Sequence, residues 1–117
     1  KSTVVPGTTD GPVRAALEEG SGLVAGTDFG LAMNPEFLSE GQAVRDFLEP
    51  DRIVVGALDA RSDAVLTDLY RPFPDSVPRL HTNTRTAEMI KYASNALLAT
   101  LVSFTNELAN MGAAIGG

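Results

Sequence analysis

Short apolar runs alternate with amphipathic stretches along the first two thirds of the chain. A short strand is predicted at residues 52–56, where the continuous apolar core indicates burial on both faces of a sheet. Further strands are predicted at residues 31–33 and 79–82, and a β-rich start at residues 1–5. Apolar residues at helical spacing predict helices near residues 13–17 and 62–70, the second with Val65, Leu66 and Leu69 on one face. Strands that alternate with helices indicate an α/β sheet.

The last third of the chain has a different pattern. Residues 84–115 contain no proline, and no glycine before Gly112, which predicts one helix of roughly 30 residues and about 45 Å. Its apolar positions recur every three or four residues and cover more than one side, at Ile90, Leu97, Leu98, Leu101, Val102, Phe104, Leu108, Ala109 and Met111. The preceding α/β segment can cover one face only, so we expect a partner on the other. The simplest partner is the same helix of a second subunit in a homodimer.

Composition narrows the class of function. The 117 residues are 44% hydrophobic, enough for a core, and carry a net charge of −6, which argues against nucleic acid as a partner. There is no cysteine, and the single histidine forms no metal-binding pattern, so no metal site is predicted. No apolar run reaches the length of a membrane span, and the start lacks a signal-peptide layout. We therefore expect a cytoplasmic protein without membrane contact.

Two carboxylates, Glu36 and Glu40, stand four residues apart in the stretch Asn-Pro-Glu-Phe-Leu-Ser-Glu-Gly at residues 34–41. With Asn34 as cap and Pro35 as first helical residue, one helical turn would place both carboxylates on one side. From the spacing alone, a solvated acidic turn and a functional pair are equally compatible with this stretch.

For other polar residues, too, a functional role is compared with a purely structural or solvent-exposed one. Lys91 and Asn95 are four residues apart on the predicted helix, away from the Leu97–Phe104 stripe. A single lysine on a helix is usually a surface residue. Arg52 beside Asp51 is interpreted as a local ion pair of little energy, and His81 as a structural or exposed residue for which no partner can be named.

Three motifs of the chain resemble those of one family, and they occur along the chain in the same order as in that family. Residues 34–41 followed by Asp-Arg-Ile-Val-Val-Gly at 51–56, then Met-Ile-Lys-Tyr-Ala-Ser-Asn-Ala at 89–96, and the opening Ser-Thr-Val at 2–4, are similar to the UDP-glucose/GDP-mannose dehydrogenases. These enzymes use NAD to oxidise the C6 alcohol of a nucleotide sugar to a carboxylate. The resemblance implies that residues 1–83 end a Rossmann-like parallel-sheet domain, with residues 2–4 in its last strand. Residues 84–117 would then begin a mainly helical dimerisation domain with a long central helix.

The resemblance also implies a role for individual residues. Lys91 and Asn95 would face the sugar carbon and supply a cation and a hydrogen-bond donor, and Glu36 would act as acid/base if its pKa is held near the working pH. Lys91 and Glu36 should then approach each other across a cleft, with Asn95 on the same side. The implied catalytic residues are Glu36, Lys91, Asn95 and Thr3; the substrate-binding residues are Glu36, Phe37, Leu38, Lys91 and Asn95; the cofactor-binding residues are Ser2, Thr3 and Glu40.

Two features of the family are absent from these residues. The chain has neither the Gly-x-Gly-x-x-Gly turn that binds the NAD pyrophosphate nor the cysteine that carries the second oxidation. We therefore expect a segment of a longer enzyme, inactive and without useful NAD affinity by itself. Its substrate would be UDP-glucose or GDP-mannose. The alternatives are a UDP-N-acetyl amino sugar dehydrogenase, or a module that only folds and oligomerises.

Overall fold

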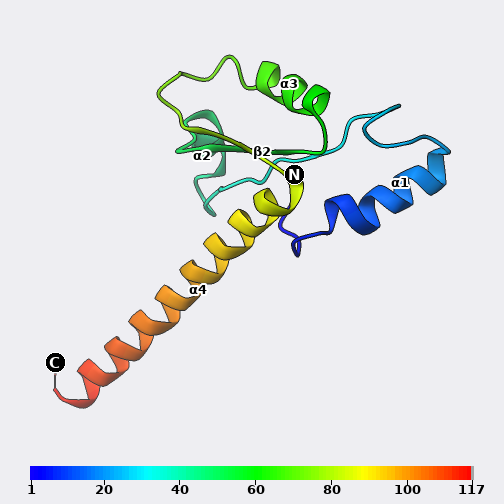
Figure 1. Cartoon of the computed structure of the whole chain (residues 1–117). Helices are drawn as coiled ribbons and strands as arrows, with labels where there is room; N and C mark the ends of the chain where they lie inside the picture. Colours follow the sequence, from blue (N-terminus) through cyan, green and yellow to red (C-terminus); the bar gives the residue numbers. More distant parts are fainter. Residues whose placement is uncertain (117) are drawn as a thin grey trace.

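The computed structural model describes residues 1–116, which form a small mixed α/β unit with one long helix projecting from it (Figure 1). The molecule measures 65 × 34 × 22 Å, and the C-terminus lies at the far end of the projecting helix. Gly117, the last residue of the predicted second domain, lies outside the described residues. In chain order the elements are the π-helix η1 (Thr9–Val13), α1 (Arg14–Ser21), β1 (Ala32–Met33), α2 (Ala43–Leu48), β2 (Ile53–Ala57), α3 (Ala60–Leu69), β3 (Arg79–Thr82) and α4 (Thr84–Ala114).

The sheet has three strands, with β2 in the centre. β3 runs parallel to β2, from the pair Ile53–Arg79 to the pair Gly56–Thr82. β1 runs antiparallel to β2, so the predicted parallel sheet is correct for one of the two pairings only. The prediction that β2 is buried on both faces is confirmed. Val54 packs with Met33 and Ala87 on one face, and Ile53 and Val55 pack with Tyr70 on the other.

The predicted strand at residues 1–5 is wrong for this structure, in which these residues pair with no strand. The chain turns immediately afterwards, because Val5 accepts hydrogen bonds from the backbone and hydroxyl of Thr8, and Gly7 adopts a φ of 93°. The segment is held by a side chain instead. Val4 packs against the cluster of Met33, Val54 and Ala87.

The helix α3 contacts the sheet through a different face from the predicted one. It begins at an Asp59 cap, whose carboxylate accepts the Ser62 N–H at 2.8 Å. Ser62 is buried and Leu66 is partly buried against β2, whereas Val65 and Leu69 are each 62% exposed. The apolar spacing therefore predicted the helix correctly, but not the side that packs. The same holds for α1, where no residue is buried.

The long helix α4 is confirmed as a single element of 31 residues, capped by Asn83, which accepts the Thr86 N–H at 2.8 Å. Only its start is covered: the buried residues are Thr84, Ala87, Glu88 and Lys91. Beyond them, the large apolar side chains are 49–62% exposed, at Leu97, Leu98, Leu101, Val102, Phe104, Leu108 and Met111. The α/β unit thus covers the first two turns of the helix rather than one face of its whole length. Among the described residues, no helix is long and apolar enough to cross a membrane.

Gly56 lies where β2 passes closest to α4, which gives a direct test of this packing. A Cβ at Gly56 would lie 2.4 Å from the Ala87 Cβ and 2.7 Å from the Asn83 carbonyl oxygen. Gly56→Ala should therefore destabilise the fold by about 3 kcal/mol, through forced displacement of α4. Gly20→Ala is the control, because nothing lies within 4 Å of that Cβ and the helix should gain about 0.5–1 kcal/mol. Chemical unfolding measures both; equal stability of the two variants would contradict the close contact.

Candidate functional site

A buried cation and a partly buried carboxylate meet where α4 passes the loop after β1. The Lys91 Nζ lies 3.3 Å from the Glu36 Oε1, with the two side chains 7% and 29% exposed. Lys91 stands at the start of the third turn of α4, and Glu36 follows β1 by three residues. The predicted approach of Lys91 and Glu36 is confirmed. Lys91 is also not the surface residue that a single helical lysine usually is.

The backbone that carries Glu36 is neither helix nor strand, so the predicted helical turn at residues 35–40 is wrong. The Glu36 Oε2 accepts the Leu38 N–H at 2.8 Å, and the Ser39 N–H donates to the Asp46 Oδ2 at 2.7 Å. The helix begins only at Ala43. Without a helical turn at these residues, Glu40 does not share a helix face with Glu36, and it is exposed.

Asn34 explains why no helix forms there. Its side chain is buried and is used in long-range bonds instead of capping: the Nδ2 donates to the Val54 carbonyl oxygen at 2.8 Å. The Oδ1 accepts from the Tyr70 hydroxyl and from the Lys1 Nζ, the latter at 3.2 Å. Asn34 thereby fixes the segment after β1 to β2 and presents Glu36 to α4.

The electrostatics of Glu36 favour its ionised form. Its pKa is lowered from the ordinary value of 4.5, first by the Leu38 N–H and then by Lys91, while burial acts in the opposite direction. The direction differs from the expectation of a pKa held near working pH. Near neutral pH, Glu36 is therefore an ionised acceptor of protons and hydrogen bonds beside a cation that can stabilise a negative oxygen.

Phe37 adds a contact that the sequence did not reveal. The Arg52 Cζ lies 4.1 Å and the Lys91 Nζ 5.3 Å from the centroid of its ring. Cations over an aromatic face are attracted by its quadrupole, so the ring helps to place both side chains. The predicted local pair of Arg52 with Asp51 is confirmed at 2.8 Å.

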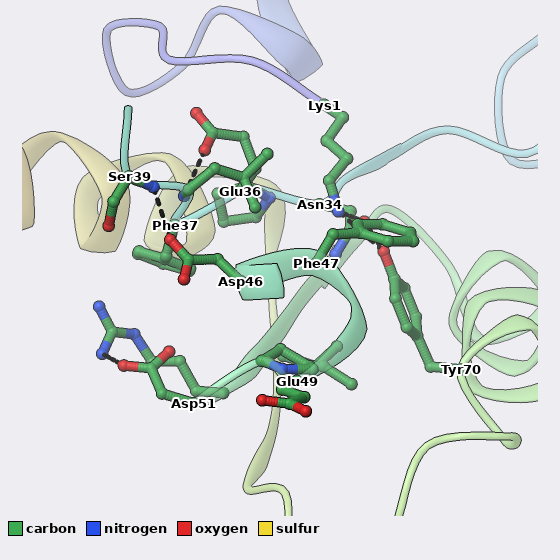
Figure 2. A pocket seen from close by; sticks show the side chains of 15 residues that line it. Lys1, Asn34, Glu36, Phe37, Ser39, Asp46, Phe47, Glu49, Asp51 and Tyr70 are labelled. Carbon is green, nitrogen blue, oxygen red and sulfur yellow. Dashed lines mark hydrogen bonds and ion pairs between the residues drawn. The ribbon is translucent and has the colours of Figure 1, made fainter. Parts of the chain in front are cut away.

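A pocket of about 220 Å³ opens beside this group, between the loop after β1, α2 and the end of α3 (Figure 2). In the figure, Glu36, Phe37 and Ser39 lie on one side of α2, and Phe47 and Tyr70 on the other. The lining is both apolar and charged. Lining residues include Lys1, Asn34, Glu36, Phe37, Leu38, Ser39, Asp46, Phe47, Arg52 and Tyr70.

Of the predicted site residues, Glu36, Phe37 and Leu38 line this pocket. Lys91 contacts Glu36 from α4 without lining the pocket, and the remaining four are exposed and lie outside it. Asn95 is one turn beyond Lys91 on the same side of α4, and lines a shallow depression that includes Ala99 and Asn106. Ser2, Thr3 and Glu40 are exposed, and within residues 1–116 the two hydroxyls have no hydrogen-bond partner. The structure thus brings Lys91, Glu36, Phe37 and Leu38 together and leaves the remaining four at the surface.

Two polar contacts were missed by the sequence analysis. His81 has a partner, because its Nδ1 lies 2.7 Å from the Asp63 Oδ1 across β3 and α3. Glu88 is fully buried and accepts the backbone N–H groups of Gly7 and Thr9. The only available signal for Glu88 was its position three residues before Lys91, which puts both on one side of the helix.

Family models account for nearly the whole chain. Residues 1–74 match the NAD-binding domain of the UDP-glucose/GDP-mannose dehydrogenase family, and residues 85–117 match the central domain of the same family. The chain belongs to the UDP-glucose/GDP-mannose dehydrogenase family. The resemblance stated from the three motifs is confirmed, and so is NAD as the cofactor of the family.

Individual members of the UDP-glucose/GDP-mannose dehydrogenase family are similar to this chain in sequence and in structure. The chain is 47% identical to the UDP-glucose 6-dehydrogenase AglM of Haloferax volcanii, over 95% of this chain and 26% of that protein. It matches the ternary complex of GDP-mannose dehydrogenase from Pseudomonas aeruginosa at a TM-score of 0.91 and 41% identity, over 98% of this chain and 26% of that one. A UDP-D-ManNAc dehydrogenase from Pyrococcus horikoshii matches at a TM-score of 0.85 and 30% identity, over 99% of this chain and 27% of that one. The chain spans about a quarter of the length of the relatives it matches.

Proposed function

We propose that these residues form part of an NAD-dependent nucleotide-sugar 6-dehydrogenase, which oxidises the C6 alcohol of UDP-glucose or GDP-mannose to the uronic acid. The observation that carries the proposal is the 3.3 Å pair of Lys91 and Glu36, which joins two of the family's motifs across more than fifty residues. The overall change converts an alcohol, one water and two NAD⁺ into a carboxylate, two NADH and three protons.

The roles of the residues follow from their surroundings. Lys91, buried beside Glu36, stabilises the oxygen of the substrate as it becomes negative. Glu36, kept ionised by the Leu38 N–H and by Lys91, accepts a proton from the alcohol or from the attacking water. Asn95 donates a hydrogen bond from the next turn of α4. Phe37 and Leu38 line the pocket beside Glu36 and contact the sugar.

The cofactor would lie on the side of Ser2, Thr3 and Glu40. NAD, when bound, supplies the acceptor for the hydride. The surroundings of Ser2 and Thr3 fit this role. Their hydroxyls are exposed and have no hydrogen-bond partner among residues 1–116, so they can bind polar groups of a cofactor or a water. They do not form the glycine-rich phosphate turn, which these 117 residues lack. This segment by itself would therefore be inactive.

The division of the chain and its association complete the proposal. Residues 1–83 would end the Rossmann-like NAD-binding domain, and residues 84–117 would begin the helical dimerisation domain, in line with family models that match on either side of this boundary. The exposed apolar side chains of α4 would pack on a second copy of the chain. The alternative of a module that only folds and oligomerises leaves the buried Lys91–Glu36 pair without a purpose.

Similarity supports a choice between the candidate sugars. Identity is 47% to the UDP-glucose enzyme and 41% to the GDP-mannose enzyme, against 30% to the UDP-D-ManNAc enzyme. These values favour glucose or mannose over an N-acetyl amino sugar as the substrate.

The assay of NAD reduction by the complete enzyme that carries this chain tests the proposed function. With UDP-glucose or GDP-mannose, absorbance at the NADH wavelength should show two NADH formed for each nucleotide sugar consumed. UDP-N-acetylmannosamine is the comparison substrate and should react more slowly. Faster reaction with UDP-N-acetylmannosamine would select the alternative substrate, and no reaction with any of the three would overturn the dehydrogenase proposal.

A further inference from the structure

The most deeply buried charged side chain of the described residues has no part in the mechanism above. Glu88, in the second turn of α4, is 0% exposed. Its Oε2 accepts the Gly7 N–H at 2.6 Å, and its Oε1 accepts the Thr9 N–H at 2.7 Å. Burial of a carboxylate is costly unless both oxygens are hydrogen-bonded, and here both are. The carboxylate therefore links two segments about 80 residues apart in sequence.

One of the two N–H groups, that of Thr9, opens a helix, and the other belongs to Gly7 in the turn just before it. η1 begins at Thr9 and continues into α1, and the residue before it, Thr8, makes no capping bond with its side chain. The Thr8 hydroxyl donates to the Val5 carbonyl oxygen instead. A helix start attracts negative charge, through its free N–H groups and its dipole. Glu88 supplies that charge from α4, so the cap of the first helix is a residue of the last.

The segment before this helix carries the two hydroxyls that the proposed function places near the cofactor. It is anchored at three points: Lys1 bonds Asn34, Val4 packs in the core, and Gly7 and Thr9 bond Glu88. Ser2 and Thr3 lie between the first two anchors and are exposed.

The third anchor connects this segment to the catalytic helix. Glu88 precedes Lys91 by three residues, and both are buried on the side of α4 that faces the rest of the chain. The position of the segment is thereby coupled directly to the helix turn that holds Lys91.

We propose that Glu88 is a positioning residue, which holds the Ser2–Thr3 segment at a fixed place relative to Lys91 and Glu36. The role rests on the proposed function, because that function places cofactor contacts on one segment and substrate contacts on the other. Loss of the double hydrogen bond lets the segment move, and a displacement of about 1 Å can lower a rate by about a hundredfold. Glu88 acts through its neighbours and touches neither substrate nor cofactor.

The variant Glu88→Gln in the complete enzyme tests the role, because glutamine keeps the size but turns an N–H donor toward one of the two backbone N–H donors. We expect kcat to fall by about tenfold or more, with the KM for the nucleotide sugar changed by less than about threefold. Amide hydrogen exchange at Gly7 and Thr9 should become at least about tenfold faster. Glu88→Asp keeps the charge on a shorter side chain and should recover part of the lost kcat.

Arg85→Gln is the matched control. Arg85 lies on the same helix and contacts η1, which follows the segment, through Asp10 at 2.8 Å, but it is exposed. Its removal should leave kcat within about twofold, since exposed ion pairs contribute little.

The outcomes separate the two proposals. Wild-type kcat in the folded Glu88→Gln enzyme, with or without faster exchange, would overturn the positioning role and leave Glu88 as a stabilising contact. Unchanged exchange at Gly7 and Thr9 would overturn it as well. An inactive wild-type enzyme would instead contradict the dehydrogenase function itself.

Discussion

Replacing Lys91 with methionine is expected to lower kcat of the enzyme that carries this chain by about 10²–10³-fold. The Lys91 side chain is 7% exposed, and its ammonium group lies 3.3 Å from the Glu36 Oε1 and would be the cation nearest to the oxygen that becomes negative. Removal of one such preorganised group from an enclosed site typically costs a factor of this size. Methionine keeps the length and apolar stem of the side chain, so packing on α4 should change little. Steady-state kinetics with the nucleotide sugar measures the loss.

The control for Lys91→Met is Arg45→Met, which breaks another cation–glutamate pair. Arg45 lies 3.2 Å from Glu49, but both side chains are more than two thirds exposed, so kcat should stay within about twofold. The pH profile adds a second readout. Lys91 is one of the groups that lower the pKa of Glu36, so the acid limb of kcat/KM should move to higher pH in the variant. Wild-type kcat in Lys91→Met would show that the pair is structural.

Replacing Phe104 with aspartate should convert the proposed dimer of the enzyme to a monomer. Seven large apolar side chains of α4 beyond Lys91 are 49–62% exposed, and Phe104 is one of them. Burial of a side chain of this size is worth about 1.5–3 kcal/mol, so a buried charge at Phe104 removes that gain and adds a desolvation cost in each subunit. Leu101→Asp should act in the same direction. Light scattering after gel filtration measures the mass.

Asn110→Asp is the matched control for Phe104→Asp. It adds the same charge six residues further along α4, on the side away from the apolar stripe. Circular dichroism must show helix in both variants, since unfolding would also abolish association. A helical Phe104→Asp enzyme that keeps the mass of the wild type would contradict the dimer helix. So would a folded wild-type enzyme that is monomeric at high concentration.

The elements that the sequence predicted correctly are those whose signal is local. β2 follows from an unbroken apolar run, and α4 from thirty residues without a helix breaker. The exception is instructive: Asn34 and Pro35 have the local pattern of a helix start, yet the Asn34 side chain bonds the Val54 carbonyl oxygen and Tyr70 instead. A tertiary contact outweighs a cap of about 1 kcal/mol, and no local rule reveals it.

The candidate site shows the same division. Glu36 and Lys91 were placed together by motif resemblance, and the structure confirms the contact. Glu88 was not predicted, because its partners are backbone N–H groups about 80 residues away, and a backbone group leaves no mark in a sequence. The packing side of α3 was missed for a related reason: Ser62 is buried through its bond to the Asp59 cap, while the apolar Val65 faces outward.

The helix α4 is packed against the α/β unit only at its start, so a movement of its exposed remainder would be transmitted to the start. Lys91 stands at the supported end, and Phe104 lies thirteen residues further along the free arm, about 20 Å away. If a second subunit binds α4 around Phe104, a tilt of the helix by about five degrees at that contact displaces the Lys91 end by about 2 Å. This is more than catalytic alignment tolerates. The rigidity of the subunit contact would then determine how precisely Lys91 is positioned relative to Glu36. Turnover per subunit should accordingly fall on dilution below the dissociation constant of the dimer, before any unfolding is detected.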